Sequence, residues 1–175
     1  MEWQQLIINV YGQVLRVLEK ALDGLDQDDL NRQPHPDCNS MGWLTWHLTR
    51  MEDARFATII GEEQVWVSDE WYARFNRPSD PSDRGIGHSS EDVAAFRSPD
   101  VDILLQYYRA VLERTRRYIS SLSMADLDQE VNMPSPQPSQ KVGVLLTGDL
   151  NGSLQHAGQV AYLRGLFKGK GWLGV

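Results

Sequence analysis

The sequence predicts an all-α protein, a four-helix bundle in which the chain runs up, down, down and up. Three observations predict this fold. Apolar residues recur at spacings of three and four in four long segments, which is the period of an amphipathic helix. No segment shows the alternation of apolar and polar residues that is typical of a strand. The connection between the second and third segments is close to forty residues, and such a long crossover lets two helices run in the same direction.

The first helix is marked by apolar residues that recur at these spacings: Trp3, Ile7, Val10, Val14 and Val17. It is expected to end near Leu22. Residues 23–39 are dense in Asp, Gly, Pro and Asn and are typical of a loop. Because Asn39 or Ser40 can accept a hydrogen bond from a free N–H group of a helix start, the second helix is expected over residues 41–60.

The crossover that follows carries turn residues at 76–90 and predicts a short helix at 91–96, capped by Ser90. Next comes the segment SPD at residues 98–100, which offers an N-cap, a first-turn proline and a first-turn acid. The third helix is therefore expected to begin there and to continue through ILLQYYRAVLERTRRYISSL.

The segment PSPQP at residues 134–138 breaks the chain again, and the fourth helix is expected over residues 142–167. The glycine-rich tail at 169–175 is expected to be irregular. A chain of 175 residues is long enough for one complete hydrophobic core and short for two, so we expect a single domain over residues 1–175.

The composition argues against several functional classes. The formal net charge is −7, and no run of Lys or Arg forms a patch that could follow a phosphate backbone, so nucleic acid is not an expected partner. The apolar runs are far shorter than the ~18 residues that a membrane span needs. Cys38 is the only cysteine, which excludes an internal disulfide. We expect a cytoplasmic protein that does not enter a membrane.

Two histidines are expected to face the bundle core. At about 100° per residue, Trp43 and Met51 lie within about 40° of His47, so the imidazole points into the apolar stripe. His156 points inward in the same way on the fourth helix. Helix bundles assemble interior metal sites from inward histidines, although two core histidines can equally be hydrogen-bonded to their neighbours. His88 is expected to be an exposed crossover residue unless its glycine-rich turn folds over the bundle mouth.

Three segments together resemble the DinB-like superfamily of four-helix bundles: NSMGWLTWHLTRMEDARF, GHSSEDVAAFRSPDVDILLQYYRAVLERT and LQHAGQVAYLRGL. That superfamily includes mycothiol-dependent maleylpyruvate isomerases and bacillithiol S-transferases. The resemblance implies a divalent metal, often zinc or nickel, held by a histidine of the second helix and by a pair spaced i, i+4 on the fourth. His47 matches the first ligand and His156 the last.

Gly152 stands where the family pattern has the middle ligand, and glycine offers no donor atom. Asp149 is expected to lie too far along the helix to replace it, and Ser153 is a poor zinc ligand. We expect Gly152 to mark close backbone packing; the alternative is an enlarged pocket. The predicted pocket residues are Trp43, Asp149, Gly152, Ser153 and Gln159.

Two functional hypotheses follow, and the sequence does not decide whether the protein is an enzyme. In the first, an interior pocket derived from a metal site serves a transferase or isomerase that uses a low-molecular-weight thiol on small electrophiles, with Asp149 or Gln159 orienting the ligands. In the second, the chain is a non-catalytic module for small-molecule binding or for dimerisation. The expected partners are a small molecule and a second copy of the chain. Trp66, Trp71 and Tyr72 could cover the bundle or form the association surface.

Overall fold

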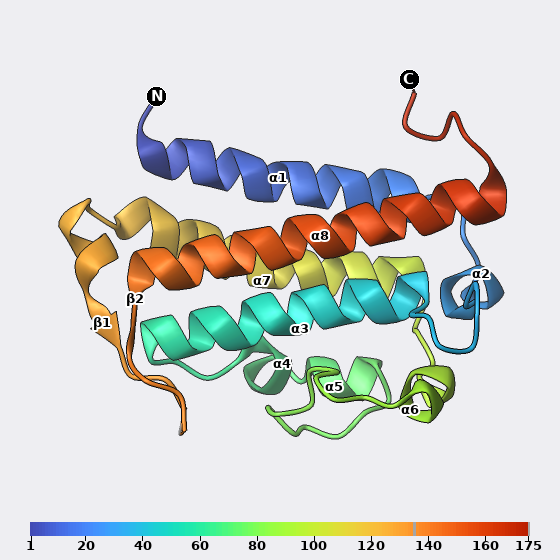
Figure 1. Cartoon of the computed structure of the whole chain (residues 1–175), viewed down its shortest axis with the longest axis horizontal. Coiled ribbons are helices and arrows are strands. Elements are labelled where there is room, and N and C mark those ends of the chain that lie inside the picture. The colour runs from blue at the N-terminus through green and yellow to red at the C-terminus, as the bar shows by residue number, and fades with distance from the viewer. Residues whose placement is uncertain (135, 175) are drawn as a thin grey trace.

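A computed structural model describes residues 1–134 and 136–174 of the chain. Its long helices form a four-helix bundle: α1 (Trp3–Leu22), α3 (Met41–Ile60), α7 (Val101–Ser121) and α8 (Val142–Lys168). Figure 1 shows α1 and α8 running in one direction and α3 and α7 in the other, which confirms the predicted topology. Helix α8 packs against both α1 and α3, so α3 and α8 are antiparallel neighbours.

Two predicted helix starts are wrong by one or two residues, because other side chains form the caps. Helix α6 (Ser90–Ala95) is capped by Ser89, whose hydroxyl accepts a hydrogen bond from the Asp92 N–H, and not by Ser90. Helix α7 is capped by Asp100, whose carboxylate accepts from the N–H of Ile103 at 2.9 Å. The proline at position 99 therefore precedes the helix and does not lie in its first turn.

The connections contain short elements that the sequence did not predict. They are α2 (Gln27–Asn31), α4 (Val65–Ser68), α5 (Trp71–Arg74), the 3-10 turn η1 (Ala125–Asp128), and the antiparallel strands β1 (Glu130–Val131) and β2 (Gln140–Lys141). Elements of two to five residues are too short to show a helical or strand period. In Figure 1 the crossover elements α4, α5 and α6 lie beside α3, on the side away from α1.

The crossover tryptophans are part of the hydrophobic core. Trp66 is fully buried and Trp71 is 7% exposed. Their rings lie 5.5 Å and 5.3 Å, between centroids, from the ring of Tyr107 on α7. These two side chains therefore attach the crossover to the bundle, and they are not available as an association surface. In the described part of the chain, every helix falls short of the length or apolarity that a membrane-spanning segment needs.

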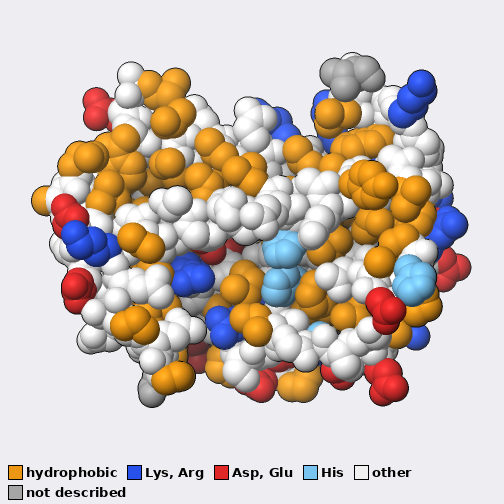
Figure 2. All heavy atoms as spheres, viewed as in Figure 1, with side chains coloured by type: hydrophobic (Ala, Val, Ile, Leu, Met, Phe, Trp, Pro, Cys, Tyr) orange, Lys and Arg blue, Asp and Glu red, His pale blue; other side chains and the backbone are white. Residues whose placement is uncertain are grey.

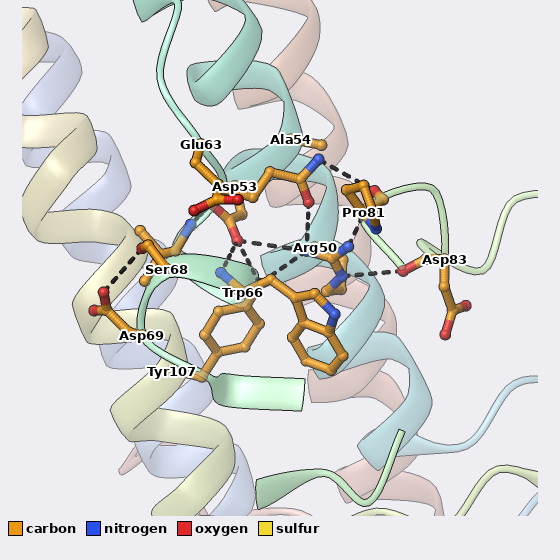
Figure 3. A network of polar contacts seen from close by, with 12 residues as sticks. Arg50, Asp53, Ala54, Glu63, Trp66, Ser68, Asp69, Pro81, Asp83 and Tyr107 are labelled. Carbon is orange, nitrogen blue, oxygen red and sulfur yellow. Dashed lines mark hydrogen bonds and ion pairs between the residues drawn. The ribbon is translucent and has the colours of Figure 1, made fainter. Parts of the chain in front are cut away.

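A buried ion network joins the crossover to α3 and α7 (Figure 3). The Asp53 carboxylate accepts hydrogen bonds from the backbone N–H groups of Val65 and Trp66, at 2.9 and 2.8 Å, where α4 begins. It also accepts from the Tyr107 hydroxyl at 2.7 Å and from the Arg114 guanidinium at 2.6 Å. Arg50 lies 3.4 Å from the same carboxylate.

Arg50 connects this network to a second part of the crossover, the turn at residues 80–84. Its guanidinium donates to the carbonyl oxygens of Asp83 at 3.0 Å and Pro81 at 3.2 Å, and it lies over the Trp66 ring, 4.4 Å from the centroid. The Arg50 side chain is fully buried. Because a buried cation needs several partners to offset its lost hydration, the turn at residues 80–84 is held close to α3.

We predict that Asp53→Ala lowers the free energy of unfolding by about 3–5 kcal/mol, since two buried guanidiniums lose their counter-charge. The measurement is urea unfolding followed by circular dichroism. The matched control is Asp69→Ala, an exposed crossover aspartate that accepts from Ser68 and is expected to change stability by less than about 0.5 kcal/mol. Equal effects of the two substitutions would contradict the role given to Asp53.

Candidate functional site

The structure brings His47 of α3 and His156 of α8 together. Their ring centroids are 4.9 Å apart and the ring planes are nearly perpendicular, at 83°. His47 is 9% exposed, whereas His156 is half-buried at the rim of the site. The convergence follows from the local sequence, because each imidazole sits on the face of its helix that meets the neighbouring helix. Figure 2 shows histidine side chains near the centre of this face of the molecule.

The backbone of the crossover fixes the orientation of the His47 ring. His47 Nδ1 is hydrogen-bonded to the carbonyl oxygen of Arg84, and the ring stacks on Trp43 with centroids 4.7 Å apart. Since a carbonyl only accepts, Nδ1 carries the hydrogen and Nε2 carries the lone pair. Burial lowers the pKa of His47 to about 4, assisted by the nearby His156, His88 and Arg84 and opposed by the hydrogen bond. The imidazole is therefore neutral at pH 7.

Gln159 orients the second imidazole in the same way. His156 Nδ1 lies 2.8 Å from Gln159 Oε1, one turn further along α8. The amide oxygen accepts, so Nδ1 carries a hydrogen and, in the neutral ring, Nε2 carries the lone pair. The amide oxygen of Gln159 is occupied by this bond.

A cavity of about 80 Å³ lies beside the two rings. It is lined by His47, Leu48, Met51, Arg55, Gly148, Asp149, Gly152, Ser153 and His156. Pockets for drug-sized ligands are several times larger, about 300–1,000 Å³, so this cavity holds only a few non-hydrogen atoms. Of the predicted pocket residues, Asp149, Gly152 and Ser153 line it. Trp43 packs behind His47, and Gln159 acts through His156.

Gly152 opens onto free space, so the expectation of close backbone packing at this residue is wrong. Apart from its two chain neighbours and the backbone of its own helix, no heavy atom lies within 4 Å of the point where a Cβ atom would stand. Gly152 lines the cavity, and its missing side chain leaves this space open. A side chain at position 152 would have room to enter it.

Asp149 supplies the carboxyl group of the cavity. It is 6% exposed, and the hydroxyl of Tyr11 on α1 donates to its Oδ2 atom at 2.8 Å. Burial raises the pKa of Asp149 to about 6, against the hydrogen bond from Tyr11 and the charge of Arg55. Glu52, fully buried on α3, also has its pKa raised, first by burial and then by the charge of Asp149. A proton is therefore retained between these carboxyl groups to a higher pH than in water.

His88 folds over the mouth of the bundle and is not an exposed loop residue. Its Nδ1 atom accepts a hydrogen bond from Trp43 Nε1 at 3.2 Å, and its ring stacks on Trp46. Gly85 makes this path possible. Its φ is +82°, and a Cβ there would stand 2.6 Å from the Trp43 ring and 3.0 Å from His47 Nδ1. Only glycine fits at this position.

Sequence reasoning missed Arg55 as a lining residue. A signal was present, because Met51 and Arg55 follow His47 at intervals of four on the same side of α3.

Cys38 and His35 do not line this cavity. Cys38 is exposed in a separate surface groove, and His35 is exposed beside Asp37.

Comparison with known proteins assigns the family. A family model for the DinB superfamily matches residues 11–160. The chain belongs to the DinB superfamily. A crystal structure of a conserved protein from Enterococcus faecalis has the same fold, with a TM-score of 0.86 and 24% identity over 97% of this chain and 99% of that one. At that identity the likeness shows the fold alone. No curated protein matches the chain.

The donor atoms present do not fit the three-ligand metal site that the resemblance to the DinB-like superfamily implies. His47 and His156 each present one free ring nitrogen, and Gly152 presents none. In the residues that the structure describes, no group of three His, Cys, Asp or Glu side chains lies close enough to hold one ion. Zinc in proteins is usually held by three or four side chains. We therefore derive no chemistry through a metal ion.

We predict that Asp149→Asn changes the pH dependence of stability. A carboxyl whose pKa is raised on folding destabilises the protein as pH rises through the interval between its unfolded and folded values, here about 4 to about 6. Relative to wild type, the Asn variant should therefore gain stability on the order of 2 kcal/mol between pH 4 and pH 7.

Urea unfolding at both pH values measures this difference. Asp69→Asn, a change of the same chemistry at an exposed position, is the control. A pH-independent difference for Asp149→Asn, or a gain at the acid end, would show that the carboxyl is not held protonated by the fold.

Proposed function

We propose that this DinB-superfamily protein binds a small molecule in the cavity between α3 and α8, and that binding does not require a metal ion. The observation that carries the proposal is the convergence of His47 and His156, 4.9 Å apart, beside the open space at Gly152. The open space gives room for ligand atoms where the family pattern has a side chain.

The polar atoms of the cavity define the ligand chemistry. Both imidazoles have Nδ1 engaged by an oxygen acceptor, which leaves Nε2 as an acceptor for a ligand O–H, N–H or S–H group. Ser153 adds a hydroxyl that is 4% exposed. A small hydrogen-bond donor therefore complements this site better than a purely apolar molecule does.

Transfer of a low-molecular-weight thiol to a small electrophile, or thiol-assisted isomerisation of it, is a second candidate. The pair of imidazoles beside the cavity favours it, since an unprotonated Nε2 can accept the S–H proton as sulfur attacks. The sulfur would add to an unsaturated carbon as the π bond at that carbon breaks, and the imidazole would return the proton to the atom that receives the π electrons. Here His47 and His156 are proton carriers and not metal ligands.

Chelator-treated protein is predicted to bind glycolamide, a neutral probe with O–H and N–H donors. Binding should shift the imidazole NMR signals of His47 and His156 with a millimolar Kd, which is realistic for five non-hydrogen atoms. His156→Ala should abolish the response. Binding that appears only after zinc or nickel is added would overturn the metal-independent proposal, and no response in either state would overturn the binding function.

Gly152→His tests the same cavity by filling its open space with a side chain. The new imidazole would occupy the open space and form an i, i+4 pair with His156, so glycolamide binding should be lost and zinc affinity should rise at least about 100-fold. Gly158→His is the matched control, because position 158 is also open but borders the surface groove that holds Cys38. It should change neither property.

A further inference from the structure

The cavity between α3 and α8 has a positively charged side chain in its lining. Arg55 lines this cavity together with the two histidines. Figure 2 shows basic side chains beside the central histidines, in the hollow between α8 and the elements below it. The chain as a whole has a net charge of −7, and the cavity lining holds one basic residue, Arg55, and one acidic residue, Asp149.

Arg55 differs from the arginines that have a structural role. Arg50 and Arg114 pair with Asp53, Arg77 pairs with Asp83, and Arg109 pairs with Glu19. Among the described residues, no carboxylate lies within 4.0 Å of the Arg55 guanidinium. A half-buried guanidinium that lines a cavity and has no carboxylate in contact favours an anionic partner, because charge-assisted hydrogen bonds are about twice as strong as neutral ones.

The surroundings add to this positive field. Arg84 contributes its carbonyl oxygen to His47, and its own Nε atom is buried with no hydrogen-bond partner. Burial lowers the pKa of Arg84, and the charges of Arg50 and Arg55 lower it further. Asp149, the acidic residue in the cavity lining, accepts a hydrogen bond from Tyr11 at its Oδ2 atom, and the charge of Arg55 also acts on it.

We propose that the ligand of this cavity is a small carboxylate that also carries a hydroxyl or amino donor, with Arg55 as the counter-charge of the carboxylate. The donor group of such a ligand bonds to an imidazole Nε2, and the carboxylate accepts from the guanidinium. Planar carboxylates match the fork of N–H groups on arginine. This inference rests on the proposed binding function, and it adds the charge of the ligand to it.

Glycolate and glycolamide test the inference, because they have nearly the same shape and differ in charge. At pH 7, glycolate should bind at least ten-fold more tightly than glycolamide, as measured by titration of the His47 and His156 ring signals. Raising the salt concentration should weaken glycolate binding and leave glycolamide binding unchanged. Acetate, which lacks the donor, should bind more weakly than glycolate.

Arg55→Gln should remove the preference for glycolate and leave glycolamide binding unchanged. Arg16→Gln is the matched control, since Arg16 is an exposed arginine of α1 away from the cavity, and it should leave both affinities unchanged. Equal affinities for the two probes in wild type would overturn the carboxylate inference while the binding function stands. The absence of binding by either probe would overturn both, and the salt dependence decides the question in wild type if the Arg55 variant does not fold.

Discussion

The rest of the structure depends on the hydrogen bonds and ion pairs that the Asp53 carboxylate forms. This carboxylate is fully buried and takes two backbone N–H groups of α4, a tyrosine hydroxyl and a guanidinium of α7, and a second guanidinium of α3. A buried carboxylate is tolerated only when its lost hydration is replaced by such bonds. Because those partners come from three separate elements, the network specifies one arrangement of the crossover on the bundle.

The geometry of the cavity follows from that arrangement. Arg50 binds carbonyl groups of the turn at residues 80–84, and the residues from there to His88 place the Arg84 carbonyl on His47 and the His88 ring over Trp46. The crossover thus determines which nitrogen of His47 bears a proton. Helix α8 supplies the other half of the site through His156, Asp149 and the open space at Gly152. The buried ion network and the geometry of the cavity therefore depend on the same position of the crossover.

Helical periodicity was sufficient to predict the four long helices, and the length of the crossover predicted their topology. The inward direction of His47 and His156 followed from the helical wheel, because apolar residues share the face of each imidazole. Gly152 was misjudged because a sequence pattern does not show whether a neighbouring helix approaches closely enough to need a glycine.

The crossover was beyond sequence reasoning for another reason. Its path depends on bonds between residues far apart in the chain, such as Asp53 with Arg114, and charged residues are normally expected at the surface. The roles of Gly85 and His88 depend on that path, so neither could be assigned from local sequence. A helical wheel places Arg55 on the same side of α3 as His47. The sequence does not show that no carboxylate contacts its guanidinium, because that depends on where the carboxylates lie in the fold.

The tautomer of His47 tests most directly whether the anchored crossover shapes the cavity. Nitrogen-15 NMR of the imidazole at pH 7 distinguishes a proton on Nδ1 from one on Nε2. The account predicts a neutral ring with the proton on Nδ1, bonded to the Arg84 carbonyl, and a bare Nε2. A proton on Nε2, or a charged ring, would contradict it.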